Sequence, residues 1–180
     1  MVVIDMQGVF GEPGSPWFTP GYPRIVRSVD ELVTSFGDRV VFTRFVLPER
    51  PEGSWIPYYR RWHAVTTEDA RSLFDLTEPW ARMRLQTLDK HTFSKWGPEL
   101  KAEAGPGRTL VLCGVSTDCC VISTAVAAAD AGMFVRIVSD ACAGVDEAAH
   151  EAALRVASGY APQIEVTTVA EELARGVPAA

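Results

Sequence analysis

The feature that most constrains the fold of this chain is a regular alternation of short apolar runs with amphipathic segments. Apolar runs of roughly four to eight residues are typical of buried strands, and amphipathic segments between them are typical of helices that cover a parallel sheet. The six predicted strands are 2–4, 39–45, 84–88, 109–115, 134–139 and 163–166. The six predicted helices are 23–36, 67–74, 98–102, 117–131, 146–159 and 170–174. The pattern predicts an α/β fold of three layers, in which a six-stranded parallel sheet lies between helices.

Length and charge limit the kind of partner that the protein binds. With 180 residues, of which 47% are hydrophobic, the chain can bury one substantial core, so we expect one domain over residues 1–180. The formal net charge is -6, the pI is about 5.1, and no basic cluster stands out. These properties argue against nucleic acid and against an anionic membrane surface as the main partner. We therefore expect a small-molecule substrate.

The sequence shows no targeting or membrane segment. No apolar stretch approaches the ~20 residues of a membrane helix, and no basic region precedes an apolar signal core. We therefore expect a cytoplasmic protein. Met1 leads directly into the predicted strand 2–4, which is shorter than the typical length of about five to six residues. We expect the native start codon to lie upstream.

The four cysteines are at positions 113, 119, 120 and 142. Their spacing is neither that of a zinc site with paired Cys-x-x-Cys motifs nor that of a disulfide scaffold. Adjacent cysteines also bond to each other only with strain. We therefore expect reduced thiols, and the question is which of them reacts.

Polar residues follow three of the predicted strands. Asp5 follows the first strand, Lys90 follows the third, and Cys119 and Cys120 follow the fourth. Each alone has a structural explanation, as a cap, a solvated strand end or a small core residue. Ligands of an open parallel sheet bind at the carboxyl ends of its strands, however, and an acid, a lysine and a thiol together can perform covalent catalysis. A nearby helix start and lysine are expected to lower the pKa of the thiol.

The segment 47–62 interrupts the α/β pattern with three prolines, one glycine and four large aromatic residues. It is too long for a simple connection, and it leaves the carboxyl end of the second predicted strand. We expect it to cover the active site of its own or of a neighbouring subunit. Trp55 and Tyr58 in this segment, together with Trp96, are candidates for contacts with a flat or apolar substrate.

Three segments resemble, in the same order, the signature segments of the isochorismatase-like cysteine hydrolase superfamily. They are VVIDMQ at the start, DKHTFSKWGPEL in the middle, and GVSTDCCVISTAVAAADAG after it. The tail, DEAAHEAAL followed by IEVTTVAEEL, is similar to that family too. The resemblance implies a Rossmann-like fold with six parallel strands and, in the amide-cleaving members, a triad of Asp, Lys and Cys. It also implies assembly into a homo-oligomer, a dimer or a tetramer.

The resemblance assigns a role to each strand-end residue. It makes Asp5 the triad acid, Lys90 the triad lysine and Cys120 the nucleophile, since the family's cysteine directly precedes a valine, here Val121. Neighbouring residues on an α-helix point about 100° apart, so Cys119 is expected to face elsewhere and to serve packing. We expect the same packing role for the thiols at positions 113 and 142.

The resemblance also implies a cis peptide bond between Val115 and Ser116. The Ser116 and Cys120 N–H groups would then form an oxyanion hole. The implied reaction is cleavage of an amide or carbamoyl C–N bond through a thioester intermediate.

Two other functions and a metal site are known among proteins with these motifs. Nicotinamidases of the superfamily carry a metal on an Asp-x-His after the second strand, whereas residues 43–47 read TRFVL, so we expect neither a metal nor another cofactor. Some members hydrolyse the vinyl ether of isochorismate, but these often lack the cysteine. Arg44 is a candidate for binding a substrate carboxylate. A non-catalytic, redox-sensing thiol domain would leave Asp5 and Lys90 unexplained.

Overall fold

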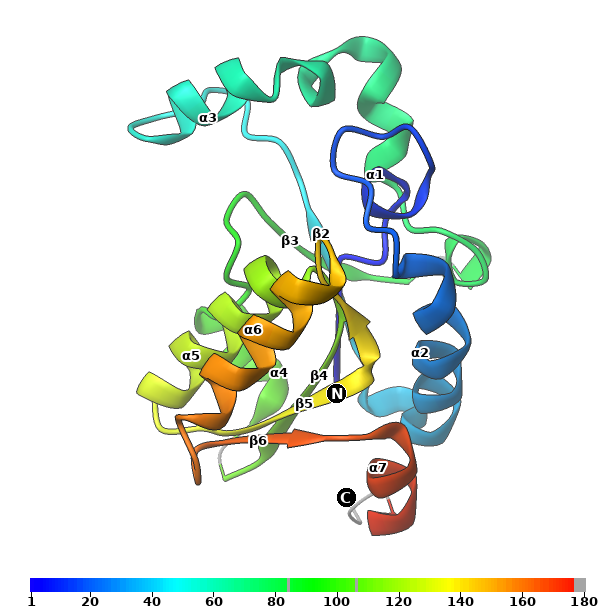
Figure 1. Ribbon diagram of the computed structural model, residues 1–180, viewed down its shortest axis with the longest axis vertical. Helices are drawn as coiled ribbons and strands as arrows, with labels where there is room; N and C mark the ends of the chain where they lie inside the picture. The colour runs from blue at the N-terminus through cyan, green and yellow to red at the C-terminus, as the bar shows by residue number, and fades with distance from the viewer. Residues whose placement is uncertain (84, 106, 177–180) are drawn as a thin grey trace.

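The computed structural model describes residues 1–83, 85–105 and 107–176, and it shows a six-stranded sheet with helices on both faces (Figure 1). The strands lie in the order β3-β2-β1-β4-β5-β6, and all neighbouring strands are parallel. This confirms the predicted fold class. The strands are β1 (Val2–Ile4), β2 (Val41–Phe45), β3 (Thr87–Lys90), β4 (Thr109–Val115), β5 (Phe134–Ala143) and β6 (Ile164–Thr167).

The helices form the two outer layers. One face of the sheet is covered by α2 (Tyr22–Phe36) and α7 (Val169–Arg175), and the other by α4 (Pro98–Ala104), α5 (Ile122–Asp130) and α6 (Glu147–Ser158). Helix α2 is held by its apolar face, because its buried residues Ile25, Val29, Leu32 and Phe36 recur every three or four positions. None of the helices in the described part of the chain has the length and apolar character needed to cross a membrane.

A third group of short elements lies beyond the carboxyl ends of the strands. It contains α1 (Gly8–Gly11), α3 (Trp55–Arg61) and the 3₁₀ segments His63–Thr66 and Glu68–Phe74, and it forms the upper part of Figure 1. These segments pack above the edge of the sheet at which ligands of parallel α/β folds bind. They therefore form a roof over that edge.

The carboxyl ends of β1 and β4 approach each other closely because position 114 is a glycine. Gly114 has a φ of +109°, and a Cβ at this position would overlap the carbonyl oxygen of Ile4. Any larger side chain would push the two strands apart. The close approach places the carboxyl ends of the two strands side by side, so the loops that follow them start next to each other.

Several predicted boundaries are wrong. Strand β3 ends at Lys90 rather than at residue 88, and its predicted first residue, Arg84, lies outside the described residues. The polar end of β3 is tolerated because it is an edge strand that pairs only with β2. The predicted helix 67–74 is a 3₁₀ segment, and the predicted helix 117–131 begins as a π-helical turn, Thr117–Val121. Helices α1 and α3 were not predicted, because each is too short for a periodic apolar pattern.

Candidate active site

The candidate site lies where the strand order reverses. The chain runs from β1 outward to β3 and then returns to place β4 on the other side of β1. The loops after β1 and β4 therefore diverge and leave a crevice between them, which is the usual ligand site of this kind of fold. Asp5 directly follows β1, and Cys120 lies in the turn that follows β4.

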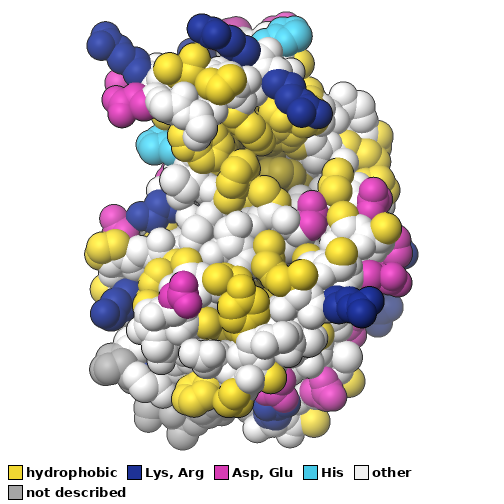
Figure 2. Space-filling model, turned by 60° about the vertical axis from the view of Figure 1, so that its left-hand side comes forward, with side chains coloured by type: hydrophobic (Ala, Val, Ile, Leu, Met, Phe, Trp, Pro, Cys, Tyr) yellow, Lys and Arg dark blue, Asp and Glu magenta, His cyan; other side chains and the backbone are white. Residues whose placement is uncertain are grey.

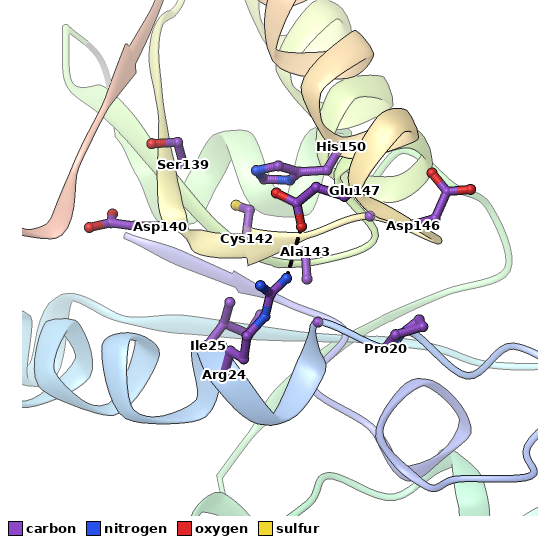
Figure 3. Close-up of a pocket in the computed structure, with 12 residues that line it drawn as sticks. Pro20, Arg24, Ile25, Ser139, Asp140, Cys142, Ala143, Asp146, Glu147 and His150 are labelled. Carbon is purple, nitrogen blue, oxygen red and sulfur yellow. Dashed lines mark hydrogen bonds and ion pairs between the residues drawn. The ribbon is translucent and has the colours of Figure 1, made fainter.

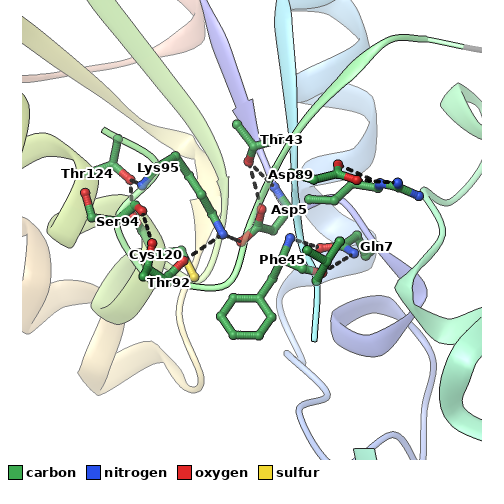
Figure 4. A network of polar contacts seen from close by, with 12 residues as sticks. Asp5, Gln7, Thr43, Phe45, Asp89, Thr92, Ser94, Lys95, Cys120 and Thr124 are labelled. Atoms are coloured by element: carbon green, nitrogen blue, oxygen red, sulfur yellow. Dashed lines mark hydrogen bonds and ion pairs between the residues drawn. The ribbon is translucent and has the colours of Figure 1, made fainter. Parts of the chain in front are cut away.

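A fully buried ion pair forms the centre of this site. Lys95 Nζ lies 2.8 Å from Asp5 Oδ2, and both side chains are 0% exposed (Figure 4). The ammonium group also donates a hydrogen bond to the Thr92 carbonyl at 3.1 Å and lies 4.9 Å from the centre of the Phe45 ring. Isolated charges are costly to bury, so these partners are what allows a lysine to sit here.

The carboxylate of Asp5 is held in one orientation. Thr43 Oγ1 donates a hydrogen bond to Asp5 Oδ1 at 2.8 Å, which leaves Oδ2 directed toward Lys95. The turn after β1 is fixed by Gln7, whose side chain bonds to both the N–H and the carbonyl of Phe45. Asp5 itself adopts a φ of +51°, which is unusual for a residue other than glycine. The acid is therefore rigidly placed.

Thr124 connects the lysine to the cysteine. Its hydroxyl accepts a hydrogen bond from the Lys95 N–H at 2.9 Å and donates one to the Cys120 carbonyl at 2.7 Å. The loop after β3 is thereby fixed to the start of α5. Figure 4 shows the Cys120 sulfur on the side of Lys95 and Asp5.

The pKa of the Cys120 thiol is raised well above its ordinary value. The largest cause is a hydrogen bond with the Cys119 thiol, followed by burial and the negative charge of Asp5, while Lys95 acts in the opposite direction. Cys120 is 3% exposed. The expected lowering of its pKa is therefore wrong.

Cys119 lies on the same cavity wall as Cys120, contrary to the expectation that it faces elsewhere. The two residues sit in a π-helical turn, in which the Val121 N–H bonds to the Ser116 carbonyl at 3.1 Å. A π-helical turn is wider than an α-helical turn, so successive side chains diverge less. The charges of Asp5 and Lys95 both influence the pKa of the Cys120 thiol, which marks Cys120 as the thiol next to the ion pair.

Lys90 does not take the position that the resemblance implied for it. It pairs with Phe45 in the sheet, and its Nζ binds Glu99 at 2.7 Å on the surface. The strand continues through Lys90, so the loop at the carboxyl edge begins later than expected and brings Lys95 to Asp5. The sequence contains one signal that points to Lys95: it lies between two aromatic residues, Phe93 and Trp96, in the motif that carried the resemblance.

Three further candidates, Arg44, Trp96 and Trp55, are not part of the cavity lining. Arg44 forms a bidentate pair with Asp89, at 3.0 Å and 2.6 Å, and also lies 3.5 Å from Asp75. Its guanidinium group is therefore paired with carboxylates of its own chain rather than with a substrate carboxylate. Trp96 packs against the hydrophobic core and is not part of the cavity lining.

The cavity beside Cys120 has a volume of about 160 Å³ and is mainly aromatic. In Figure 2, hydrophobic side chains gather in a hollow beneath the upper part of the molecule. Tyr58 and Trp62 come from the segment 47–62, so this segment covers the site of its own subunit, as expected. The aromatic lining residues are Phe10, Trp17, Phe18, Phe45, Tyr58, Trp62 and Phe93.

Replacing Tyr58 or Trp55 with alanine should weaken catalysis without unfolding the protein. Tyr58 lines the cavity, and the Trp55 ring supports it at 5.2 Å while contacting Phe93 at 4.9 Å. We expect kcat/KM to fall by about tenfold in each variant, because an aromatic contact contributes up to ~1.5 kcal/mol. Ile56→Ala on the same helix, where Ile56 is 40% exposed, is the control and should leave kcat/KM unchanged. Equal kinetics in all three variants, with intact circular dichroism, would contradict a role for the segment.

The peptide bond between Val115 and Ser116 is cis, in agreement with the expectation from the resemblance. Val115 is fully buried, whereas Ser116 and Cys120 both line the cavity. The Ser116 hydroxyl lies 3.4 Å from that of Thr19, another lining residue. The two residues predicted to form the oxyanion hole, Ser116 and Cys120, thus lie on the wall of the same cavity.

A larger pocket, of about 480 Å³, lies between the start of α2, the end of β5 and the start of α6 (Figure 3). Its most prominent charges, Arg24 and Glu147, pair with each other at 2.9 Å on the surface. Neither Asp5 nor Lys95 nor Cys120 lines it. The smaller aromatic cavity is therefore the candidate active site.

The residues do not fit a metal of the nicotinamidase type. Over the described ranges 1–83, 85–105 and 107–176, no group of three or more His, Cys, Asp or Glu side chains could hold a metal ion. The end of β2 presents Thr43 and Arg44, and both already donate hydrogen bonds to carboxylates of the chain.

Comparison with known proteins agrees with the fold and the motifs. Over 61 residues the chain is 41% identical to isochorismatase domain-containing protein 2 of Xenopus laevis, a match that covers 32% of this chain and only 30% of that protein. The fold is similar to that of a cysteine hydrolase from Pseudomonas syringae pv. phaseolicola, with a TM-score of 0.79, 22% identity, and coverage of 97% of this chain and 90% of that chain. It is also similar to N-carbamoylsarcosine amidase from Thermoplasma acidophilum, with a TM-score of 0.69, 22% identity, and coverage of 93% and 94%.

A protein-family model described as the Isochorismatase domain matches residues 1–171. This match spans all three signature segments and the six strands. The chain therefore belongs to the isochorismatase family.

Proposed function

We propose that the protein hydrolyses the C–N bond of a small amide through a thioester on Cys120. The observation that carries this proposal is the buried Asp5–Lys95 ion pair next to a thiol on the wall of a substrate-sized cavity. Such a pair supplies a base and a fixed positive charge at the nucleophile. The names of the two structural neighbours, a cysteine hydrolase and an amidase, support the same chemistry.

In the first step, the Cys120 sulfur forms a bond to the carbonyl carbon while its proton passes to Asp5. The raised pKa of the thiol means that the proton leaves during attack rather than beforehand. Lys95 stabilises the partial negative charge that develops on sulfur as the proton leaves. The electron pair of the carbonyl moves to oxygen, where the N–H groups of Ser116 and Cys120 are the proposed donors.

The tetrahedral intermediate then collapses. The C–N bond breaks, the leaving nitrogen takes the proton from Asp5, and a thioester remains on Cys120. A water molecule next gives a proton to Asp5 and attacks the thioester carbon. When the C–S bond breaks, Asp5 returns that proton to sulfur, so acid and thiol are regenerated and one water is consumed for each amide.

The substitution Asp5→Asn should separate this mechanism from its alternatives. Amide hydrolysis, measured as ammonia release, should fall by about 10³-fold or more, because an amide cannot accept the thiol proton. Alkylation of Cys120 by iodoacetamide should instead become faster, because loss of the Asp5 charge leaves Lys95 and lowers the pKa of the thiol. Peptide mapping identifies the labelled cysteine, and circular dichroism checks the fold.

Other outcomes would favour the competing functions. Ammonia release that survives Asp5→Asn would contradict the role of Asp5 as base. A wild-type protein that is alkylated readily but hydrolyses no amide fits a redox-sensing thiol domain instead. Release of pyruvate from isochorismate that persists in Cys120→Ala would indicate the vinyl ether reaction.

A further inference from the structure

We infer that the acyl group of the substrate is uncharged, apolar and about the size of a benzene ring. This inference rests on the proposed function, because it assigns the substrate class of the same cavity. It starts from the chemistry of the lining. Seven of the lining residues are aromatic, and in the part of the chain that the structure describes the lining contains no Lys, Arg or His.

The cation closest to the reacting thiol is not free to bind a substrate carboxylate. Lys95 is 0% exposed, and its ammonium group is occupied by Asp5, by the Thr92 carbonyl and by the face of the Phe45 ring. Arg44 is held by Asp89 outside the cavity. A carboxylate in the cavity would therefore lose part of its hydration without gaining a positively charged partner.

Among the described residues, the one charged side chain in the lining is an acid, which repels an anion. Asp118 lines the cavity, and its Oδ1 accepts a hydrogen bond from the Val145 N–H at 2.9 Å. Val145, also a lining residue, is 54% exposed, so the carboxylate of Asp118 stands near the opening. It repels anionic substrates on entry, in agreement with the net charge of -6.

The rings leave limited room for the acyl group. The cavity volume of about 160 Å³ is close to that of an apolar protein cavity of about 150 Å³ that binds benzene. Trp17 packs edge-on against Phe45 and Trp62, with ring centres 5.5 Å and 6.5 Å apart. The rings thus contact one another as a packed apolar wall, which favours a neutral group over a cation that needs several open ring faces.

A set of four amides tests the inference on the wild-type protein. Two are 3,3-dimethylbutanamide and betaine amide, which have the same shape but differ in one charge, because nitrogen replaces carbon. Succinamate places a carboxylate at the same end, and benzamide tests the size of the cavity. We expect kcat/KM, from ammonia release, to be about tenfold or more higher for the two neutral amides than for the charged ones. A higher value for succinamate or betaine amide would overturn the inference and leave the proposed function intact.

Acylation by p-nitrophenyl acetate distinguishes the remaining outcomes. If this ester acylates Cys120, detected as a mass increase that Cys120→Ala abolishes, but neither neutral amide is hydrolysed, the inferred substrate class is wrong. If neither the ester nor any amide reacts at Cys120, the proposed function fails, and the inference fails with it.

A substitution in the cavity wall should shift the substrate preference from the neutral amide toward the anionic amide. Trp62→Arg places a cation in the cavity, whereas Trp62→Gln removes the ring without adding charge. The ratio of kcat/KM for succinamate to that for 3,3-dimethylbutanamide should rise by about tenfold or more in the arginine variant alone. An equal rise in both variants would show that bulk, and not charge, excludes the carboxylate.

Discussion

Cys120→Ala should abolish amide hydrolysis, whereas Cys119→Ala should retain most of it. The expected loss is about 10³-fold or more in kcat, because no other group forms the thioester. Cys119 lines the same cavity, but the charges of Asp5 and Lys95 act on the Cys120 thiol. Both variants are compared with the amide that the wild-type protein hydrolyses fastest.

The Cys119→Ala variant also has an expected signature of its own. A hydrogen bond with the Cys119 thiol is the largest cause of the raised pKa of Cys120, so its loss should lower that pKa. Alkylation of Cys120 should then reach its full rate at a lower pH than in the wild type. A variant that loses hydrolysis while Cys120→Ala keeps it would make Cys119 the nucleophile.

Lys95→Met should eliminate activity, whereas the matched change Lys90→Met should not. Without Lys95 the Asp5 carboxylate is buried beside the thiol with no opposite charge, so the pKa of Cys120 rises further and its alkylation slows. Removing one partner of a buried pair costs about 3–5 kcal/mol of stability, so the melting temperature should fall as well. Lys90 pairs with Glu99 on the surface, and its loss should change neither activity nor stability noticeably.

For Lys95→Met, a loss of activity caused by unfolding must be separated from a loss of activity in the folded protein. The double variant Asp5→Asn/Lys95→Met removes both charges and should recover part of the melting temperature, because no unpaired charge remains buried. It should remain inactive, since both the base and the cation are absent. Full activity of Lys95→Met, or inactivity of a stable Lys90→Met, would return the lysine role to Lys90.

Local pattern was sufficient for the fold class because each element carries its own signal. The apolar runs of β1, β4 and β5 and the periodic face of α2 can bury their side chains only in a layered α/β arrangement. The same pattern placed Asp5 and Cys120 at strand ends, since the carboxyl ends of neighbouring parallel strands meet at one edge. The ordered motifs reinforced both conclusions.

The sequence led to Lys90 rather than Lys95, because the two lysines lie within one motif. Selecting between Lys90 and Lys95 requires knowing where β3 ends, and the end of an edge strand is decided by pairing with β2 rather than by its own residues. The electrostatics of the thiol depends in the same way on three-dimensional neighbours. Burial, Cys119 and Asp5 outweigh Lys95, so the pKa rises although the nearby lysine was expected to lower it.

The sequence by itself determined the fold class and the placement of the acid and the thiol at strand ends, because these depend on local pattern, and its resemblance to the family implied the position of the cis peptide bond. Only the tertiary structure decided which lysine meets Asp5, that both cysteines share one wall, and that the described residues lining the cavity are mainly aromatic and include no cation. Those properties arise where residues distant in the chain pack together. Ion-pair partners, burial and cavity shape are set there by contacts that no short stretch of sequence contains.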